Sequence, residues 1–259
     1  MNSYFMGVDD TDVLGRKPGT GRLARELGAT LREQGLARLL GVVRQQLLVD
    51  PRIPYTSHNS PAVLVLEIGA NGASERAFDA AAAYVTERSA PGSDPGLCLA
   101  AAARLNGEVR AFGMRASVDV VSKADALSLA ARAGLRLVEL GGTGDGVIGA
   151  LAGVGLTAGG NAGRFLEYGD GLREVGETIT AAALRARGIG LLNLARNAEW
   201  VPDDAAIFVG DRLRPRLLDG KPVLLVDAGA EGWIAFDRRP PKADGDEHGH
   251  GHGYGQDDA

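Results

Sequence analysis

Hydrophobic residues occur along this chain in short buried runs and in longer segments with a helical repeat. The run "SYFMGV" at 3–8 predicts a buried strand that ends at the acidic stretch "DDTD". Leu23, Leu27 and Leu31 then recur every four residues and predict an amphipathic helix with Thr20 as its N-cap. A strand, a polar loop and a helix therefore open the chain.

The next part of the chain continues the alternation of strands and helices. Aliphatic segments at 36–49 and 61–69 predict two strands joined by the polar loop "DPRIPYTSHNSP". The segment 72–90 predicts a helix capped by Ser74. A further helix is predicted where "SKADALSLAARAG" opens with the capping-box pair Ser122 and Asp125.

The pattern changes near residue 170. Short apolar runs at 205–210, 222–227 and 232–236 predict a small β-rich unit over 171–238, after an α/β unit over 1–170. The last segment, 239–259, is rich in proline, glycine and charge, and it predicts a disordered His/Gly tail. The expected fold class is therefore α/β (α+β).

Composition narrows the class of protein. In 259 residues, 45% are hydrophobic and only 5% aromatic, so we expect a core of Ala, Leu and Val. The single cysteine, Cys98, has no second thiol to share and is interpreted as a small buried residue. No apolar run approaches about 18 residues and no basic start precedes an apolar segment, so we expect no membrane partner and a cytoplasmic protein.

The acidic stretch is the first candidate site. Asp9, Asp10 and Asp12 place three carboxylates at a strand end, where like charges lose hydration and repel one another unless a cation offsets them. Carboxylate oxygens are hard ligands suited to Mg²⁺, with Asp9 and Asp10 as the expected metal ligands. The alternative is an exposed Asx-turn that leads off the strand.

A glycine-rich loop, "GRKPGTGR", follows the acidic stretch. Gly19 and Gly21 would let backbone N–H groups approach a phosphate at the N-terminus of the next helix. Arg16 and Lys17 could neutralise its charge. The spacing is not that of a Walker A loop, and an ordinary helix cap is the alternative.

A second glycine-rich segment, "GGTGDGVIGALAGVGL", repeats the arrangement of strand, loop and helix. Its loop residues Thr143, Gly144, Asp145 and Gly146 are candidate cofactor-binding residues, because a hydroxyl, a carboxylate and flexible glycines meet at a helix start. A tight strand-to-helix turn is the structural alternative. Two such loops in one chain favour a shared phosphate site.

Histidines point to two further candidate sites. Tyr55, His58 and Asn59 lie in the polar loop between two predicted strands and are candidate substrate residues, with His58 the one imidazole outside the tail. In the tail, the three histidines that alternate with glycine could hold a metal weakly: His248, His250 and His252.

Four motifs occur in an order that is known from one family. "GVDDTD" with "GTGRLA", then "IPYTSHNSPAV", "SDPG" and "GDGVIGALAGVG" resemble the motifs of archaeal tRNA-isoleucine agmatinylcytidine synthetase over about residues 4–156. The resemblance implies a kinase-like first domain in which Asp9, Asp10 and Asp12 hold Mg²⁺ and ATP. It also implies self-phosphorylation of Thr20 and an ATP loop at 144–149. In that family ATP activates C2 of an anticodon cytidine, which agmatine then attacks.

Two features depart from the family. The basic loop after "IPY" is "TSHNS" here and has lost both cations, which puts the substrate contacts in doubt. After Leu156 the chain has no cysteines and about 100 residues, so neither a zinc ribbon nor the OB-fold that grips tRNA is expected. The net charge of −5 likewise gives no general attraction for nucleic acid.

These patterns predict an enzyme that uses Mg²⁺-ATP. We expect it to transfer phosphate to Thr20, to a small-molecule or amide acceptor, or to both in turn, with Asp12 orienting or deprotonating the attacking hydroxyl. One alternative is modification of a tRNA cytidine with a partner subunit, and a homo-oligomer is also left open. Another is a non-catalytic module that binds a nucleotide or carries metal.

Overall fold

The chain folds as a mixed α/β protein, which confirms the predicted fold class. The computed structural model describes residues 2–15, 18–54, 58–70, 72–169, 171–173, 175–195, 199–229 and 232–238. Within these ranges the α-helices are α1 (Thr20–Glu33), α2 (Ala73–Arg88), α3 (Gly107–Ala116), α4 (Lys123–Ala133), α5 (Gly146–Gly159) and α6 (Ala181–Ala186). Single 3₁₀ turns lie at Ala102–Arg104 and Phe236–Arg238.

The strands form one extended sheet. They are β1 (Asn2–Asp9), β2 (Arg38–Arg44), β3 (Ala62–Ile68), β4 (Gly96–Ala101), β5 (Arg136–Glu139), β6 (Arg164–Tyr168), β7 (Thr178–Thr180), β8 (Gly190–Asn193), β9 (Ala206–Phe208), β10 (Arg216–Leu218), β11 (Lys221–Gly229) and β12 (Gly232–Ala235). Their spatial order is β5-β4-β1-β3-β2-β6-β10-β11-β12-β9-β7, with β8 beside β11. Helices alternate with strands as predicted, yet most neighbouring strands pair antiparallel, and among the described pairs only β8 with β11 and β9 with β12 run parallel.

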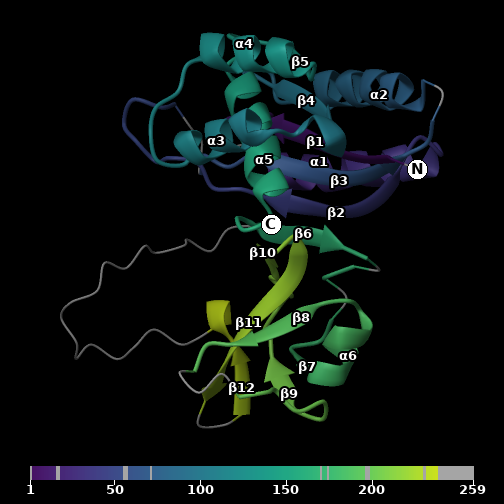
Figure 1. Cartoon of the computed structure of the whole chain (residues 1–259), viewed down its shortest axis with the longest axis vertical. Helices are drawn as coiled ribbons and strands as arrows, with labels where there is room; N and C mark the ends of the chain where they lie inside the picture. Colours follow the sequence, from purple (N-terminus) through teal and green to yellow (C-terminus); the bar gives the residue numbers. More distant parts are fainter. Residues whose placement is uncertain are drawn as a thin grey trace.

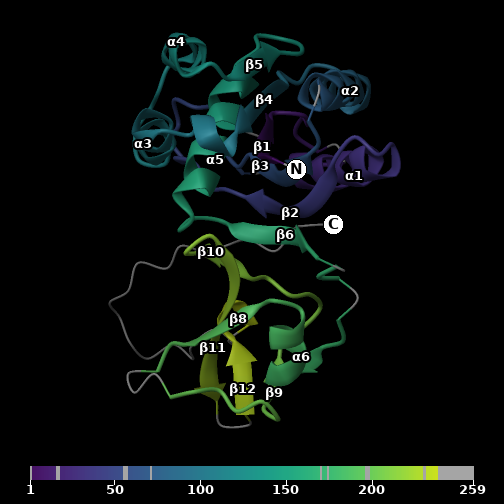
Figure 2. The same ribbon diagram turned by 45° about the vertical axis from the view of Figure 1, so that its right-hand side comes forward.

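Helices cover both faces of the N-terminal part of the sheet (Figure 2). On one face α1 and α2 pack over a core that contains Met6, Leu27 and Leu64, all fully buried. On the other face α3, α4 and α5 enclose a second core around Cys98 and Leu151. Burial of Cys98 confirms the interpretation of this residue as a small apolar core residue.

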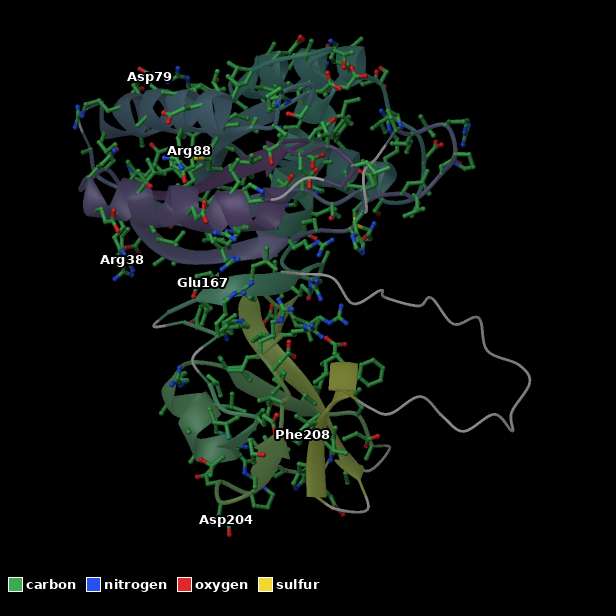
Figure 3. The ribbon with its side chains drawn as sticks, turned by 180° about the vertical axis from the view of Figure 1, so that it is seen from behind. Arg38, Asp79, Arg88, Glu167, Asp204 and Phe208 are labelled. Carbon is green, nitrogen blue, oxygen red and sulfur yellow. The ribbon has the colours of Figure 1, made fainter. Side chains whose placement is uncertain are left out.

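The remaining strands build a third hydrophobic core (Figure 1). Strand β6 connects it to the N-terminal part, because β6 pairs with β2 on one side and through Arg164 with Arg216 of β10 on the other. Figure 3 shows Glu167 of β6 between the two groups of elements and Phe208 well inside the C-terminal one. This group also contains the short helix α6, which the prediction of an all-β unit missed. The boundary near residue 170 stays a prediction, and the tail 239–259 lies outside the described residues.

Local predictions had mixed outcomes. The Ser122 hydroxyl accepts a hydrogen bond from the Asp125 backbone N–H at 3.1 Å, which confirms that cap of α4. Ser74 was predicted wrongly as a cap: it lies inside α2, and the N-cap is Gly72 at φ 73°, a left-handed conformation that a serine rarely adopts. Among the helices that the structure describes, none combines the length and the apolar character that crossing a bilayer requires.

Candidate functional site

A cavity of about 530 Å³ opens where β1 ends. The predicted site residues in its lining are Asp9, Asp10, Asp12, Thr20, Gly21, His58, Asn59, Thr143, Asp145 and Gly146. Gly19 and Gly144 are sequence neighbours of this lining but do not belong to it. Arg16, Lys17, Tyr55 and the three tail histidines lie outside the described residues. Segments far apart in the sequence thus meet here, among them the first residues of α1 and of α5.

Backbone geometry fixes the acidic end of β1. Asp9 still pairs with Gly96 of β4 in the sheet ladder. Asp10 then adopts φ 55°, the left-handed region that Asp and Asn tolerate better than other non-glycine residues. The chain therefore leaves the sheet abruptly after Asp9, and both half-buried residues contribute to the cavity wall.

Glycines in α5 allow that helix to lie directly on the end of β1. A Cβ built on Gly149 would stand 1.6 Å from Asp9 Oδ2, and one built on Gly7 would stand 2.1 Å from the Ala150 carbonyl oxygen. Only residues without a side chain fit at either position. The small-residue pattern of 146–159 therefore brings the start of α5 against the Asp9 carboxylate.

Burial and mutual repulsion disfavour the ionised forms of Asp9 and Asp10. Burial raises the pKa of Asp9 to about 8, and repulsion from Asp10 and Asp12 adds to the effect. Burial likewise raises the pKa of Asp10 to about 6, with further contributions from Asp94, Asp12 and Asp145. The charged forms of both groups are thus disfavoured in the protein alone, as expected for a site in which a bound cation offsets the repulsion.

Thr20 has a different local role from the one predicted. The N-cap of α1 is Gly19, and Thr20 is the first helical residue. Its hydroxyl oxygen accepts a hydrogen bond from the Thr11 hydroxyl at 3.0 Å instead of capping the helix. The Asp12 carboxylate lies near the preceding residue, because a Cβ built on Gly19 would be 3.2 Å from Asp12 Oδ2. Thr20 is 8% exposed and borders the cavity.

The second glycine-rich loop is held by two side chains that the sequence analysis did not name. The Asp94 carboxylate accepts the backbone N–H of Thr143. Lys123 Nζ, at the start of α4, donates to the Thr143 carbonyl oxygen at 2.5 Å and lies 3.8 Å from Asp145 Oδ1. Asp94 belongs to the quoted motif "SDPG", which was the available signal, whereas Lys123 carries no motif.

The end of β2 and the loop from β2 to β3 also line the cavity. The Asn59 amide donates to the Leu48 carbonyl oxygen at 2.7 Å, so this predicted substrate residue also fixes the loop itself. Half-buried His58 lines the cavity beside it. Arg44 and Arg52 line the cavity too, and Arg44 Nε donates to the Ser60 hydroxyl at 3.0 Å. Neither arginine was predicted: Arg44 lies in a segment that the apolar pattern marked only as a strand, and Arg52 lies in the polar loop but outside its named candidates.

The charges around the cavity are mostly negative. Asp9, Asp10, Asp12, Asp94, Asp119 and Asp145 line it, against Arg44 and Arg52. Within the part of the chain that the structure describes, no three His, Cys, Asp or Glu side chains are arranged to hold a metal ion by themselves. Mg²⁺ typically takes one or two carboxylates and completes its shell with phosphate oxygens and water, so this donor set fits Mg²⁺ bound together with a ligand.

Comparison with known proteins yields structural neighbours. Neither a family model nor a curated protein sequence matches the chain. The crystal structure of TiaS in complex with its tRNA and ATP is 25% identical with a TM-score of 0.52, over 60% of this chain and 36% of that one. The structure of a tRNA fluorescent labeling enzyme is 26% identical with a TM-score of 0.50, over 59% of this chain and 36% of that one. The complex of TiaS with tRNA, AMPCPP and agmatine shares the fold at 24% identity and a TM-score of 0.50.

The matches cover little more than a third of these enzymes, 36% of each chain. Their names agree with the family that the four sequence motifs indicated, since the apo form of TiaS is described as a tRNA agmatidine synthetase. About 60% of the present chain is therefore similar in structure to TiaS, which confirms the predicted resemblance.

Proposed function

We propose that this chain is an ATP-dependent enzyme that transfers the γ-phosphoryl group of ATP to an oxygen of an acceptor. The observation that carries the proposal is the cavity itself, where the acidic end of β1 meets the N-termini of α1 and α5. Helix N-termini attract phosphate oxygens, and the two loops that precede them are rich in glycine. Similarity to the TiaS complex with ATP supports this assignment.

Asp9 and Asp10 would hold Mg²⁺. When bound, the ion neutralises phosphate charge and helps to orient the γ-phosphate. The raised pKa values of the two carboxyl groups support this role, because an adjacent dication favours their ionised forms. Arg44 and Arg52, which also line the cavity, would supply positive charge near the phosphates, Arg52 while paired with Asp50 at 2.8 Å.

The chemical step needs chiefly positioning and charge neutralisation. The bond from the γ-phosphorus to its bridging oxygen breaks as the bond to the acceptor oxygen forms, and ADP leaves. Where Thr20 is the acceptor, its hydroxyl proton would pass to the Asp12 carboxylate, which lines the same cavity. Where an amide oxygen is the acceptor, it attacks directly, and the phosphorylated amide becomes a target for a nucleophile.

Two acceptor classes have support from different observations. The net charge of −5 favours a small amide-type acceptor bound between the carboxylates and the loop that carries Tyr55, His58 and Asn59. Similarity to enzymes described in complex with tRNA favours a tRNA base, with a partner subunit contributing contacts. Because this chain matches only 36% of those enzymes, the whole reaction of TiaS is not transferred to it.

Incubation of the purified protein with γ-labelled ATP and Mg²⁺ tests the proposal, with the label mapped by mass spectrometry. Asp10→Asn should abolish labelling, and Thr20→Ala should remove label from Thr20 alone. Asp79→Asn is the matched control, because Asp79 is an exposed carboxylate on α2 that pairs with Arg136. Figure 3 shows it on the outer side of that helix. Absence of both labelling and ATP consumption would favour the non-catalytic module instead.

A further inference from the structure

Three arginines lie side by side across the strands that join the two parts of the molecule. In the sheet register Arg44 of β2 is paired with Arg164 of β6, and Arg164 is paired with Arg216 of β10. Paired residues on adjacent strands project from the same face of a sheet. One end of this series is the cavity, because Arg44 lines it.

The pairing of Arg164 with Arg216 is of the close type. The Phe165 N–H donates to the Pro215 carbonyl oxygen at 2.8 Å, and the Leu217 N–H donates to the Gly163 carbonyl oxygen at 3.1 Å. These bonds flank the two arginines, which therefore form a non-hydrogen-bonded pair, the kind with the closer side chains. Like charges directly opposite each other destabilise a sheet, so the arrangement adds nothing to stability on its own.

The face that carries these arginines is the face of α1. Phe165, next to Arg164, belongs to the third core, whereas Leu166 packs against the core beneath α1. Because neighbouring strand residues project from opposite faces, Arg164 projects toward the α1 side. A Cβ built on Gly21, at the start of α1, would stand 2.7 Å from Leu166 Cδ1. Arg164 thus lies beside the end of α1 that borders the cavity.

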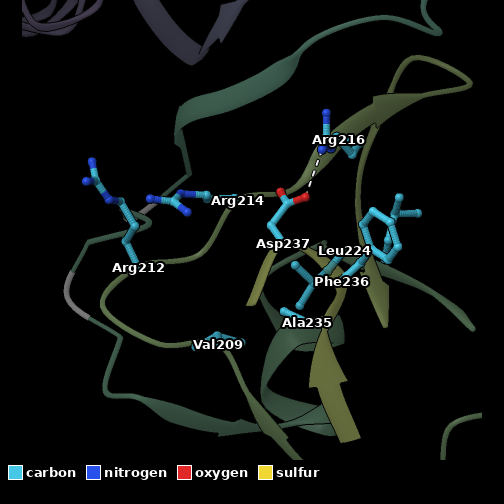
Figure 4. A pocket seen from close by; sticks show the side chains of 9 residues that line it. Val209, Arg212, Arg214, Arg216, Leu224, Ala235, Phe236 and Asp237 are labelled. Carbon is cyan, nitrogen blue, oxygen red and sulfur yellow. Dashed lines mark hydrogen bonds and ion pairs between the residues drawn. The ribbon is translucent and has the colours of Figure 1, made fainter. Parts of the chain in front are cut away.

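Two more arginines extend the series beyond β10. Arg212 and Arg214 precede Arg216 at alternate positions, whereas Leu213 and Leu217 between and after them are buried at 2% and 4% exposure. Arg212, Arg214 and Arg216 line one hollow, and Arg164, Arg212 and Arg214 line the next. Figure 4 shows Arg212 and Arg214 on one side of this hollow and Arg216 beside Asp237. We call Arg44, Arg164, Arg212, Arg214 and Arg216 the arginine row.

Members of the arginine row pair with neighbouring carboxylates. Arg216 pairs with Asp237 at 2.8 Å, the interaction drawn in Figure 4, and Arg212 pairs with its sequence neighbour Asp211 at 3.2 Å. Arg164 is the cross-strand partner of Arg216, and Arg212 and Arg214 precede Arg216 at every second position. A guanidinium group binds phosphate oxygens through two parallel hydrogen bonds, which makes a phosphate-bearing ligand the natural partner of such a series.

The shape of the surface selects an extended ligand. Each hollow has a volume of about 10 Å³, room for one water-sized group, so neither encloses a small molecule. Arg44, Arg164 and Arg216 lie on three adjacent strands, roughly 5 Å apart from one strand to the next, so their charges follow one another across the sheet. Phe236 is 41% exposed and lines the hollow with Arg216, so an aromatic ring on which a base could stack accompanies the charges.

We infer that the arginine row binds the phosphodiester backbone of a single-stranded nucleic acid and directs it toward the cavity. This inference rests on the proposed function, because it makes the acceptor a nucleic acid. The row lies beyond the motif-bearing residues 4–156, apart from Arg44. It would supply basic contacts that the loop "TSHNS" lacks, and it is a local attraction in a chain of net charge −5.

Fluorescence anisotropy with a short labelled single-stranded RNA tests the inference on the full chain. The double variant Arg164→Gln with Arg214→Gln should weaken binding about tenfold and reduce the dependence of log affinity on log salt by about 0.7 per lost contact. The control Arg104→Gln with Arg110→Gln removes equal charge from exposed positions next to and on α3, on the opposite face, and should leave binding unchanged. Arg164→Lys with Arg214→Lys keeps the charge and should retain most of the binding, which separates loss of contact from misfolding.

Calorimetric ATP binding to the same variants separates this inference from the proposed function. Arg164 and Arg214 do not line the cavity, so ATP affinity should be unchanged in the double variant. Two results would overturn the role of the arginine row and leave the proposed function standing, provided that ATP binding is normal. One is equal RNA affinity in the Arg164→Gln/Arg214→Gln variant and the Arg104→Gln/Arg110→Gln control. The other is no RNA binding by the parent protein. Displacement of RNA by inorganic polyphosphate as effectively as by unlabelled RNA of equal charge would overturn the nucleic-acid assignment. A protein that binds no ATP would contradict the proposed function.

Discussion

The carboxylate cavity and the arginine row concentrate opposite charges by different structural means. In the cavity, chain segments converge from distant parts of the sequence, and glycines such as Gly149 let α5 lie directly against the Asp9 carboxylate. In the row, sheet register and alternation alone place Arg164 opposite Arg216. Only the cavity has the depth to enclose a ligand, with about 530 Å³ against about 10 Å³ for each hollow. The difference indicates a reaction site in one place and a surface for a long ligand in the other.

The largest effect should follow removal of one charge from the cavity. Asp10→Asn should lower the rate of ATP turnover roughly 100-fold or more, because the metal loses a ligand whose charge stabilises the transferring phosphate. Steady-state measurement of ADP release would show this. Asp79→Asn should retain the full rate. Equal rates for Asp10→Asn and Asp79→Asn would show that the cavity carboxylates take no part in ATP turnover.

Stability should respond to the same cluster in a pH-dependent way. Since the pKa of Asp9 is raised to about 8, the folded protein binds a proton that the unfolded chain has released, and stability falls as pH rises from about 4 through 8. Asp9→Asn removes this penalty and should raise the free energy of unfolding on the order of 3 kcal/mol at pH 9, with little change at pH 4. Thermal unfolding at both pH values measures it. A variant that is less stable than the parent at pH 9 would contradict the electrostatic account.

Packing of α5 against β1 provides the next test. Gly149→Ala places a methyl group where the Asp9 carboxylate lies. The variant should lose about 1–3 kcal/mol of unfolding free energy and should also bind ATP more weakly. Gly159→Ala in the same helix is the matched control, because no heavy atom lies within 4 Å of its built Cβ. Urea unfolding of the pair compares them. Equal stability would mean that α5 does not depend on the close approach at Gly149.

The smallest effect is expected at the second glycine-rich loop. Lys123→Met removes the bond to the Thr143 carbonyl oxygen, which should weaken ATP binding about fivefold through a less ordered loop while the fold persists. Lys221→Met, at an exposed position on β11, should leave ATP affinity unchanged. Calorimetry compares the ATP affinities of the two variants. Unchanged affinity in both would show that the loop does not need the contact made by Lys123.

Short-range patterns made much of the N-terminal fold predictable. Strands β1 and β3 follow from short apolar runs, and the Ser122 cap follows from local hydrogen bonding. Strand β4, "GLCLAA", was missed because its small residues continue into the alanines of 100–103 and give no separate strand signal. Helix α3 was missed because its sequence is short and contains glycine.

The candidate site was predictable only in part. The acidic motif and both glycine-rich loops indicated the right region, because each carries a recognisable local pattern. Contacts such as Gly149 with Asp9 join positions 140 residues apart, and no local pattern encodes them. Arg44 and Lys123 gain their positions through the tertiary fold alone, and Thr20 proved not to cap α1 because Thr11 offers it a hydrogen bond.

Titration calorimetry of ATP in the presence and absence of Mg²⁺ tests the central claim most directly. The account predicts that the parent protein and Asp79→Asn bind ATP only with Mg²⁺, because the acidic cavity repels the free nucleotide, and that Asp10→Asn binds it weakly in either condition. Binding of ATP with equal affinity with and without Mg²⁺, or binding that Asp10→Asn leaves intact, would contradict the claim that the carboxylates at the end of β1 hold a metal–nucleotide complex.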